Sequence, residues 1–133
     1  MPCRIVALTV LLLITLITSA HADSFRTPNK AAYCYFTAKG EPAEGGPASN
    51  HQLWCWTPND GFALNMNRPR GKAYKGYDDR FKGNYPSMDR VLRFGQRWSR
   101  PGYTCASRST GLTCKNRAGH GWWLGRFKGY KLF

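Results

Sequence analysis

The chain has 133 residues and carries 20 Lys and Arg side chains against 7 Asp and Glu, a formal net charge of +13 at pH 7. This length corresponds to one folded domain and excludes an assembly of several domains. Residues 68–133 hold 16 of the basic side chains and 3 of the acidic ones. This excess of positive charge in one half of the chain favours an anionic partner: nucleic acid, an acidic glycan, lipopolysaccharide, anionic lipid or an acidic protein.

The N-terminal segment has the order of a secretory signal peptide. Arg4 precedes an apolar run from Ile5 to Ile17, and small residues follow, with Ala20-His21-Ala22 as the expected cleavage site. A membrane anchor is the alternative, but the run is shorter than the roughly 20 apolar residues that span a bilayer. We therefore predict a secreted or periplasmic protein in which residues 1–22 are removed and residues 23–133 form a single domain.

The predicted mature domain contains four cysteines, Cys34, Cys55, Cys105 and Cys114. An even number in a small exported domain predicts two disulfides in an oxidising compartment. Of the three possible connectivities we favour the sequential one, Cys34 with Cys55 and Cys105 with Cys114, because each pair would join neighbouring strands. A zinc site of four thiolates is the alternative, but its usual signature is two closely spaced cysteine pairs. We predict no metal and no cofactor.

Short aromatic and β-branched runs between Gly, Pro and Asn residues predict strands, and helical periodicity is absent from the mature part. We expect strands at 31–37, 52–57, 62–66 and 89–95, a polar loop at 38–50 and a turn at 58–61. The stretch 67–86 is either a long surface loop or an irregular strand with exposed edges. Residues 102–107 and 111–116 predict a hairpin in which Cys105 and Cys114 face each other. The predicted fold is all-β, a small sandwich or partly open barrel tied by two disulfides.

The two ends of the mature chain resemble a family of small exported bacterial domains of unknown function. Its closing pattern is C-x-S-x-x-x-G-L-T-C-x-N-x-x-G-H-G-F-x-L-S-R, and its opening pattern is F-x-T-P-S-x-N-I-x-C. The residues that carry the resemblance are Phe25, Thr27, Pro28, Cys34, Cys105, Ser107, Gly111, Leu112, Thr113, Cys114, Asn116, Gly119, His120, Gly121, Leu124, Arg126 and Phe133. The chain departs from the pattern at Asn29, Ala31, Ala32, Trp122 and Gly125. The resemblance implies export, a similar fold and disulfides, and it implies no reaction.

His120 lies between Gly119 and Gly121, where glycines supply a positive φ or allow close approach of the backbone. One interpretation is a titratable group that acts as acid or base near neutral pH. The other is a histidine whose ring bonds a backbone carbonyl and fixes the turn. We favour the second, because no orienting carboxylate is near in the sequence.

A nuclease-like set can also be assembled from His51, His120 and either Glu41 or Glu44. Both glutamates, however, fall in the Gly/Pro-rich stretch 38–50, and His51 follows it. A catalytic site works best on rigid elements that hold its side chains in place. We therefore favour a binding function over a nuclease that uses these residues.

Four tryptophans are further candidates. If 52–57 is a strand, Trp54 and Trp56 share one face while Cys55 points to the other, and we expect both rings to be core. Trp122 and Trp123 are adjacent, so a strand must direct them to opposite faces. An outward tryptophan near Arg126 and Lys128 could stack on a sugar or a base.

The densest basic segment consists of Arg68, Arg70, Lys72, Lys75, Arg80 and Lys82. It is either a solvated loop or a polyanion contact, and the interleaved Tyr74, Tyr77, Phe81 and Tyr85 favour the contact, although they could instead anchor the loop. We predict a basic binding protein rather than an enzyme, with an anionic envelope component or an acidic protein as partner. Its predicted contacts are this segment together with His120, Trp122, Trp123, Arg126 and Lys128. The alternatives are a small exported hydrolase or nuclease that uses His120, and an inhibitor or toxin-like protein with a protein target.

Overall fold

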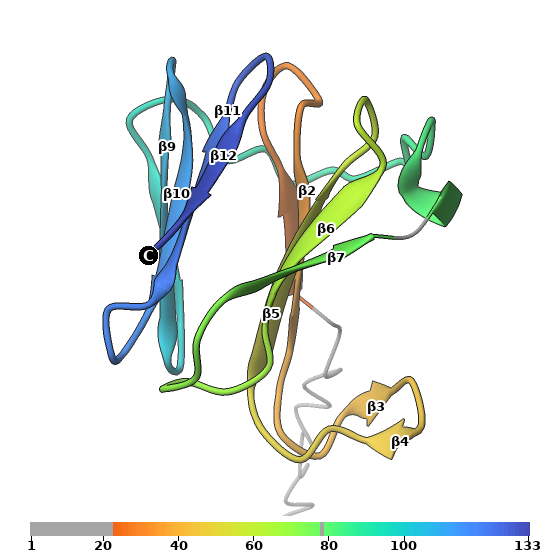
Figure 1. The fold of residues 1–133 in the computed structure, drawn as a ribbon, viewed down its shortest axis with the longest axis vertical. Helices are drawn as coiled ribbons and strands as arrows, with labels where there is room; N and C mark the ends of the chain where they lie inside the picture. Colours follow the sequence, from red (N-terminus) through yellow and green to blue (C-terminus); the bar gives the residue numbers. More distant parts are fainter. Residues whose placement is uncertain (1–22, 78) are drawn as a thin grey trace, which may run out of the picture.

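The computed structural model describes residues 23–77 and 79–133, so the predicted signal peptide lies outside the described residues. The chain forms two five-stranded antiparallel sheets that pack face to face, together with a two-stranded hairpin (Figure 1). This confirms the all-β prediction and selects the sandwich, since neither sheet closes into a barrel. No helix in the described part of the chain is long and apolar enough to cross a membrane.

Both sheets are meanders in which spatial order follows chain order. The first sheet contains β1 (Asp23–Arg26), β2 (Tyr33–Thr37), β5 (Gln52–Thr57), β6 (Phe62–Met66) and β7 (Tyr74–Tyr77). The second contains β8 (Arg97–Arg100), β9 (Tyr103–Arg108), β10 (Gly111–Asn116), β11 (Gly121–Gly125) and β12 (Tyr130–Leu132). The hairpin of β3 (Pro42–Ala43) and β4 (Gly46–Pro47) lies between β2 and β5 in the chain, and the 3-10 turn η1 (Asp79–Phe81) follows β7.

The inner faces of the two sheets form one hydrophobic core. Phe25 on β1 contacts Trp98 on β8, and Phe62 on β6 contacts Tyr130 on β12, each pair with ring centroids 5.2 Å apart. The alternation of buried and exposed side chains along β9 and β10 produces this arrangement, because successive residues of a strand point to opposite faces. Burial of the apolar face of each sheet is the main force that holds the sheets together.

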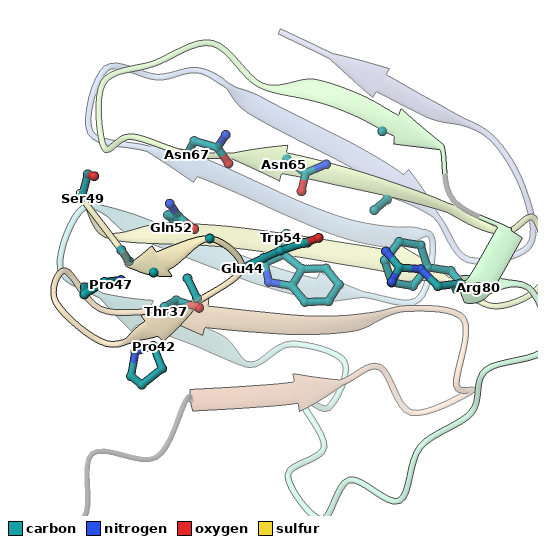
Figure 2. A pocket seen from close by; sticks show the side chains of 17 residues that line it. Thr37, Pro42, Glu44, Pro47, Ser49, Gln52, Trp54, Asn65, Asn67 and Arg80 are labelled. Carbon is teal, nitrogen blue, oxygen red and sulfur yellow. The ribbon is translucent and has the colours of Figure 1, made fainter.

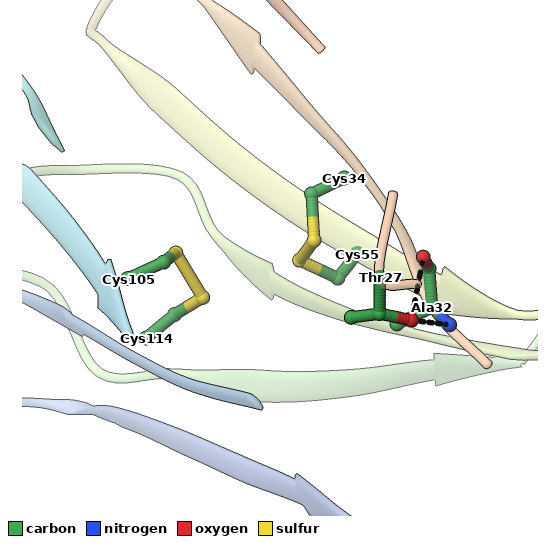
Figure 3. The surroundings of a disulfide bond; sticks show 6 residues. All are labelled: Thr27, Ala32, Cys34, Cys55, Cys105 and Cys114. Atoms are coloured by element: carbon green, nitrogen blue, oxygen red, sulfur yellow. Dashed lines mark hydrogen bonds between the residues drawn. A yellow bond between two sulfur atoms is a disulfide. The ribbon is translucent and has the colours of Figure 1, made fainter. Parts of the chain in front are cut away.

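Both disulfides have the predicted pairing and lie in this core (Figure 3). Cys34 and Cys55 are directly opposed on β2 and β5, and Cys105 and Cys114 are directly opposed on β9 and β10. The Cα–Cα distances are 4.0 and 4.1 Å. All four thiols are thereby consumed, which excludes the tetrathiolate zinc site, and the two bonds indicate an oxidising, non-cytoplasmic setting.

Most predicted strands are present, but the strand expected at 89–95 is wrong. In that stretch Val91 makes a single parallel bridge to Arg26, and the next strand begins at Arg97. The segment is the crossing between the sheets. Two backbone hydrogen bonds tie this segment to β1: Arg26 N donates to Arg90 O at 3.0 Å, and Leu92 N donates to Arg26 O at 2.9 Å. The pairing stays a single bridge and does not extend into a strand.

The two stretches expected to be irregular contain short regular elements. The polar loop 38–50 includes β3 and β4, and Ala48 within it is buried. The stretch 67–86 begins as a loop, continues as β7 and then forms η1. It is therefore neither wholly a loop nor wholly a strand.

Candidate binding surface

The outer face of the second sheet carries basic side chains and no acidic ones. Its outward-pointing residues, which we call the basic face, are Arg97, Ser99, Thr104, Ala106, Arg108, Thr113, Lys115, Trp123 and Lys131. All four of its Arg and Lys residues are exposed. Because Asp89 is the last acidic residue of the sequence, no carboxylate side chain comes from the sheet itself. The face is therefore a region of uncompensated positive charge.

A continuous row of opposed residues crosses the basic face. The strand register places Arg97, Ala106, Thr113, Trp123 and Lys131 side by side on five successive strands. Neighbouring strands lie about 4.8 Å apart, so the row is roughly 19 Å long. The side chains of β8, β9 and β10 enclose a shallow hollow of about 460 Å³, which Arg97, Ala106 and Thr113 of the row help to line. The face thus offers a cation at each end of the row and a depression that overlaps the row.

Trp123 stands in this row with its indole against the backbone. A Cβ added to Gly111 would lie 2.9 Å from the Nε1 atom of Trp123, and one added to Gly125 would lie 3.0 Å from its Cη2 atom. The two glycines are directly opposed on β10 and β11. The indole therefore covers both glycines, and this contact limits its rotation. Since Trp123 is half-buried, part of the ring stays open to solvent.

The structure decides between the two adjacent tryptophans. Trp122 is fully buried and packs in the core near the Cys105–Cys114 disulfide, with Cys114 directly opposed to it. Trp122 is thus a core residue and not a surface contact, while Trp123 faces outward.

Two other predicted contacts lie at one end of the basic face. The guanidinium of Arg126 sits over the rings of Phe94 and Phe127, at 5.2 and 5.0 Å from their centroids. Arg126 and Arg108 line the same small depression, and Lys128 is exposed in the turn between β11 and β12. Arg126 and Lys128 therefore extend the positive surface beyond the sheet.

The basic segment 68–82 does not form one patch. Arg68, Arg70 and Lys72 lie in the loop before β7, whereas Arg80 and Lys82 follow its other end. Between them, the Nζ atom of Lys75 lies 4.8 Å from the ring centroid of Phe62 and 5.1 Å from that of Tyr130. Lys75, on the edge strand β7 of the first sheet, thus also contacts the edge strand β12 of the second sheet.

Three of the interleaved aromatic residues, Tyr74, Phe81 and Tyr85, make contacts that hold this region in place. The Tyr74 hydroxyl accepts a hydrogen bond from the Asn67 amide at 2.7 Å. Phe81 contacts Trp54 and Trp56, with centroid distances of 5.6 and 5.8 Å. The Tyr85 hydroxyl donates to Oδ1 of Asn59. These contacts match the anchoring alternative that the sequence left open.

His120 lies in the turn between β10 and β11, but the side chain that fixes this turn is Asn116. The Oδ1 atom of Asn116 accepts hydrogen bonds from the backbone N–H groups of Ala118 and His120, each at 3.1 Å. Sequence reasoning assigned the fixing role to the imidazole and missed Asn116. The signal was present, because Asn116 belongs to the closing motif.

Two members of the nuclease-like set form hydrogen bonds with the backbone of the loop at 38–50. Nδ1 of His51 accepts the backbone N–H of Lys39, and the Glu41 carboxylate accepts that of Ala38, both at 2.9 Å. Both side chains therefore serve the loop that contains them. Within residues 23–77 and 79–133, no group of three or more His, Cys, Asp or Glu side chains could hold a metal ion.

Trp54 and Trp56 lie on the outer face of the first sheet, outside the main core. The expected burial is confirmed for Trp56, whereas Trp54 is only half-buried. Their neighbours Leu53 and Cys55 occupy the inner positions of β5 and are fully buried, so the tryptophans must point away. Trp56 is buried in a second, smaller cluster on this outer face, and the half-buried Trp54 packs against that cluster.

No protein-family model matches this chain, and no curated protein or solved structure shows significant similarity to it. The resemblance of its two ends to a family of exported domains therefore stays a prediction.

Proposed function

We propose that the protein is exported, loses residues 1–22 and binds an anionic polymer of the cell envelope through the basic face. The Asp23 carboxylate, which directly follows the expected cleavage site, pairs with Arg90 and Arg100. The two disulfides suit the oxidising compartment that such a protein would reach.

The placement of Trp123 within the row of opposed residues carries the binding proposal. The exposed cations attract a polyanion over a distance, and the partly open indole supplies a surface on which a ring can stack. The row is roughly 19 Å long, so an extended polymer contacts it with several repeat units. A single small anion would use only one end of this surface.

The test measures binding of three labelled polyanions to the oxidised protein as a function of salt: a heparin oligosaccharide, polyphosphate and single-stranded DNA. Four cations on the face predict a salt slope of about 3 for a single-stranded probe. Lys131→Gln should lower this slope by about 0.7. Lys39→Gln is the matched control, because it removes one exposed charge from the loop after β2 and should leave the slope unchanged.

Trp123→Ala separates stacking from charge. It should weaken binding of single-stranded DNA roughly tenfold at every salt concentration while the salt slope stays the same. Equal effects of Lys131→Gln and Lys39→Gln would contradict the proposal. So would an envelope protein that remains bound above about 1 M salt, where the screening length is near 3 Å, because that result favours a specific protein partner.

A further inference from the structure

A second cleft lies on the outer face of the first sheet, on the opposite side of the sandwich from the basic face (Figure 2). Outward side chains of β2, β5 and β6 form its floor. The hairpin of β3 and β4 forms one wall, and Arg80 and Phe81 form the other. Its volume of about 670 Å³ falls within the range of about 300–1,000 Å³ that is typical of pockets for small ligands.

Trp54 lines this cleft with an indole whose orientation is already fixed. Its ring stacks on Tyr35 and Trp56, with centroid distances of 5.3 and 5.2 Å, and Phe81 packs against it at 5.6 Å. The residue is half-buried, and Figure 2 shows its ring in the cleft between the hairpin and Arg80. The cleft thus contains a partly exposed apolar platform that needs no rearrangement to receive a flat ligand surface.

Two side-chain amides flank the platform. Asn65 is directly opposed to Trp54 on β6, and Gln52 lies two residues earlier on the same face of β5. Neither side-chain amide has a hydrogen-bond partner among the residues that the structure describes. Each amide offers N–H donors and a carbonyl acceptor in one plane. Both are therefore available to a ligand that presents hydroxyl groups.

Space above Asn65 is kept open by small neighbours. Gly76 is directly opposed to Ala63, and both line the cleft. A Cβ added to Gly76 would lie 3.2 Å from Nδ2 of Asn65, which is tighter than an ordinary contact. A larger residue at position 76 would therefore fill the cleft next to the amide.

We infer that this cleft binds a pyranose unit of a neutral glycan. One face of a pyranose ring carries C–H groups that pack on an indole, and its edge carries hydroxyls that donate to and accept from amides and donate to carboxylates. Glu44 and Arg80 contribute opposite charges to the lining, which favours an uncharged ligand over an anion. The inference concerns binding and not hydrolysis, because glycosidases use paired carboxylates and Glu44 is the one carboxylate in the described lining.

The test titrates the oxidised, isotope-labelled protein with tetrasaccharides of N-acetylglucosamine, glucose, mannose and galactose, up to millimolar concentrations. NMR follows the indole N–H of Trp54 and the side-chain amides of Gln52 and Asn65. At least one tetrasaccharide should shift these signals. Trp54→Ala should weaken its binding roughly tenfold or more. Gly76→Val should block it with Trp54 in place, which keeps the test valid if Trp54→Ala perturbs the stacked rings.

Trp123→Ala is the control on the opposite face and should leave sugar binding unchanged. Conversely, Trp54→Ala should leave polyanion binding unchanged, so this inference and the proposed function can fail separately. The inference is overturned if none of the four sugars shifts the Trp54 signal, or if binding survives both cleft variants. A shift of the Trp54 signal with protein concentration alone would overturn it in favour of a second copy of the chain.

Discussion

The Nδ2 atom of Asn116 donates a hydrogen bond of 2.6 Å to the carbonyl oxygen of Gly71, 45 residues earlier in the chain. The same nitrogen contacts the carbonyl of Arg68, while Oδ1 fixes the turn that contains His120. One buried side chain thereby joins the loop before β7 to the second sheet. A further bond, from Arg117 N to Pro69 O at 3.0 Å, supports the same junction.

Asn116→Ala should release this loop. The substitution removes hydrogen bonds on both sides of the amide and should lower the free energy of unfolding by about 2–4 kcal/mol. Urea unfolding measures the loss, and hydrogen exchange should show faster exchange in residues 68–72. Asn67→Ala is the control, because its bond to Tyr74 is exposed and its loss should cost no more than about 0.5 kcal/mol. Equal costs for the two variants would contradict the assigned role of Asn116.

The two disulfides should differ in their contribution to stability. The Cys34–Cys55 bond spans 21 positions and the Cys105–Cys114 bond spans 9. The chain-entropy model then gives about 3.4 and about 2.7 kcal/mol, because a longer closed loop restricts the unfolded chain more. Paired Cys→Ala variants compared by urea unfolding measure both values. A larger loss for the Cys105–Cys114 pair would mean that folded-state packing, not loop length, sets the difference.

Tyr103 should make the protein sensitive to alkaline pH. Its buried hydroxyl donates to the carbonyls of His51 and Met66, and burial raises the pKa of Tyr103 well above its ordinary value of about 10. A raised pKa means that the folded state retains the proton. The stabilisation is therefore complete below about pH 10 and is lost as the pH rises further, by up to about 1.4 kcal/mol per pH unit.

Tyr103→Phe removes this group and measures its effect. The wild-type protein should be more stable at pH 8, and its advantage over the variant should shrink above about pH 10. Urea unfolding of both proteins from pH 8 to pH 11.5 provides the comparison, since the other titrating groups are shared. A constant difference across that range would show that the Tyr103 hydroxyl does not titrate differently in the folded and unfolded states.

The two glycines beside His120 should respond differently to substitution. Gly119 has φ of +86° with open space around its Cα, so Gly119→Ala should cost about 1–2 kcal/mol through backbone strain alone. A Cβ on Gly121 would lie 1.9 Å from the carbonyl oxygen of Cys114. Gly121→Ala should therefore cost more and disturb the pairing of β10 with β11. Thermal unfolding of the two variants tests the ranking, and a smaller cost at Gly121 would contradict it.

Alternation along the chain was enough to predict which residues share a face. It placed Cys55 opposite Trp54 and Trp56, it separated Trp122 from Trp123, and it aligned Cys105 with Cys114 in a hairpin. These relations are local, because a strand repeats every two residues whatever surrounds it. The pairing of Cys105 with Cys114 followed from the same local geometry, whereas that of Cys34 with Cys55 was expected only because each bond would join neighbouring strands.

Only the tertiary structure decided which face looks inward. The inner faces are those that bury the disulfides against the other sheet, and this choice turns Trp54 and Trp123 toward solvent on opposite sides of the domain. It also separates Arg68 from Arg80, because β7 lies between them. A two-residue period fixes orientation within a strand, whereas burial against the partner sheet selects the face, and that selection depends on contacts between residues far apart in the sequence.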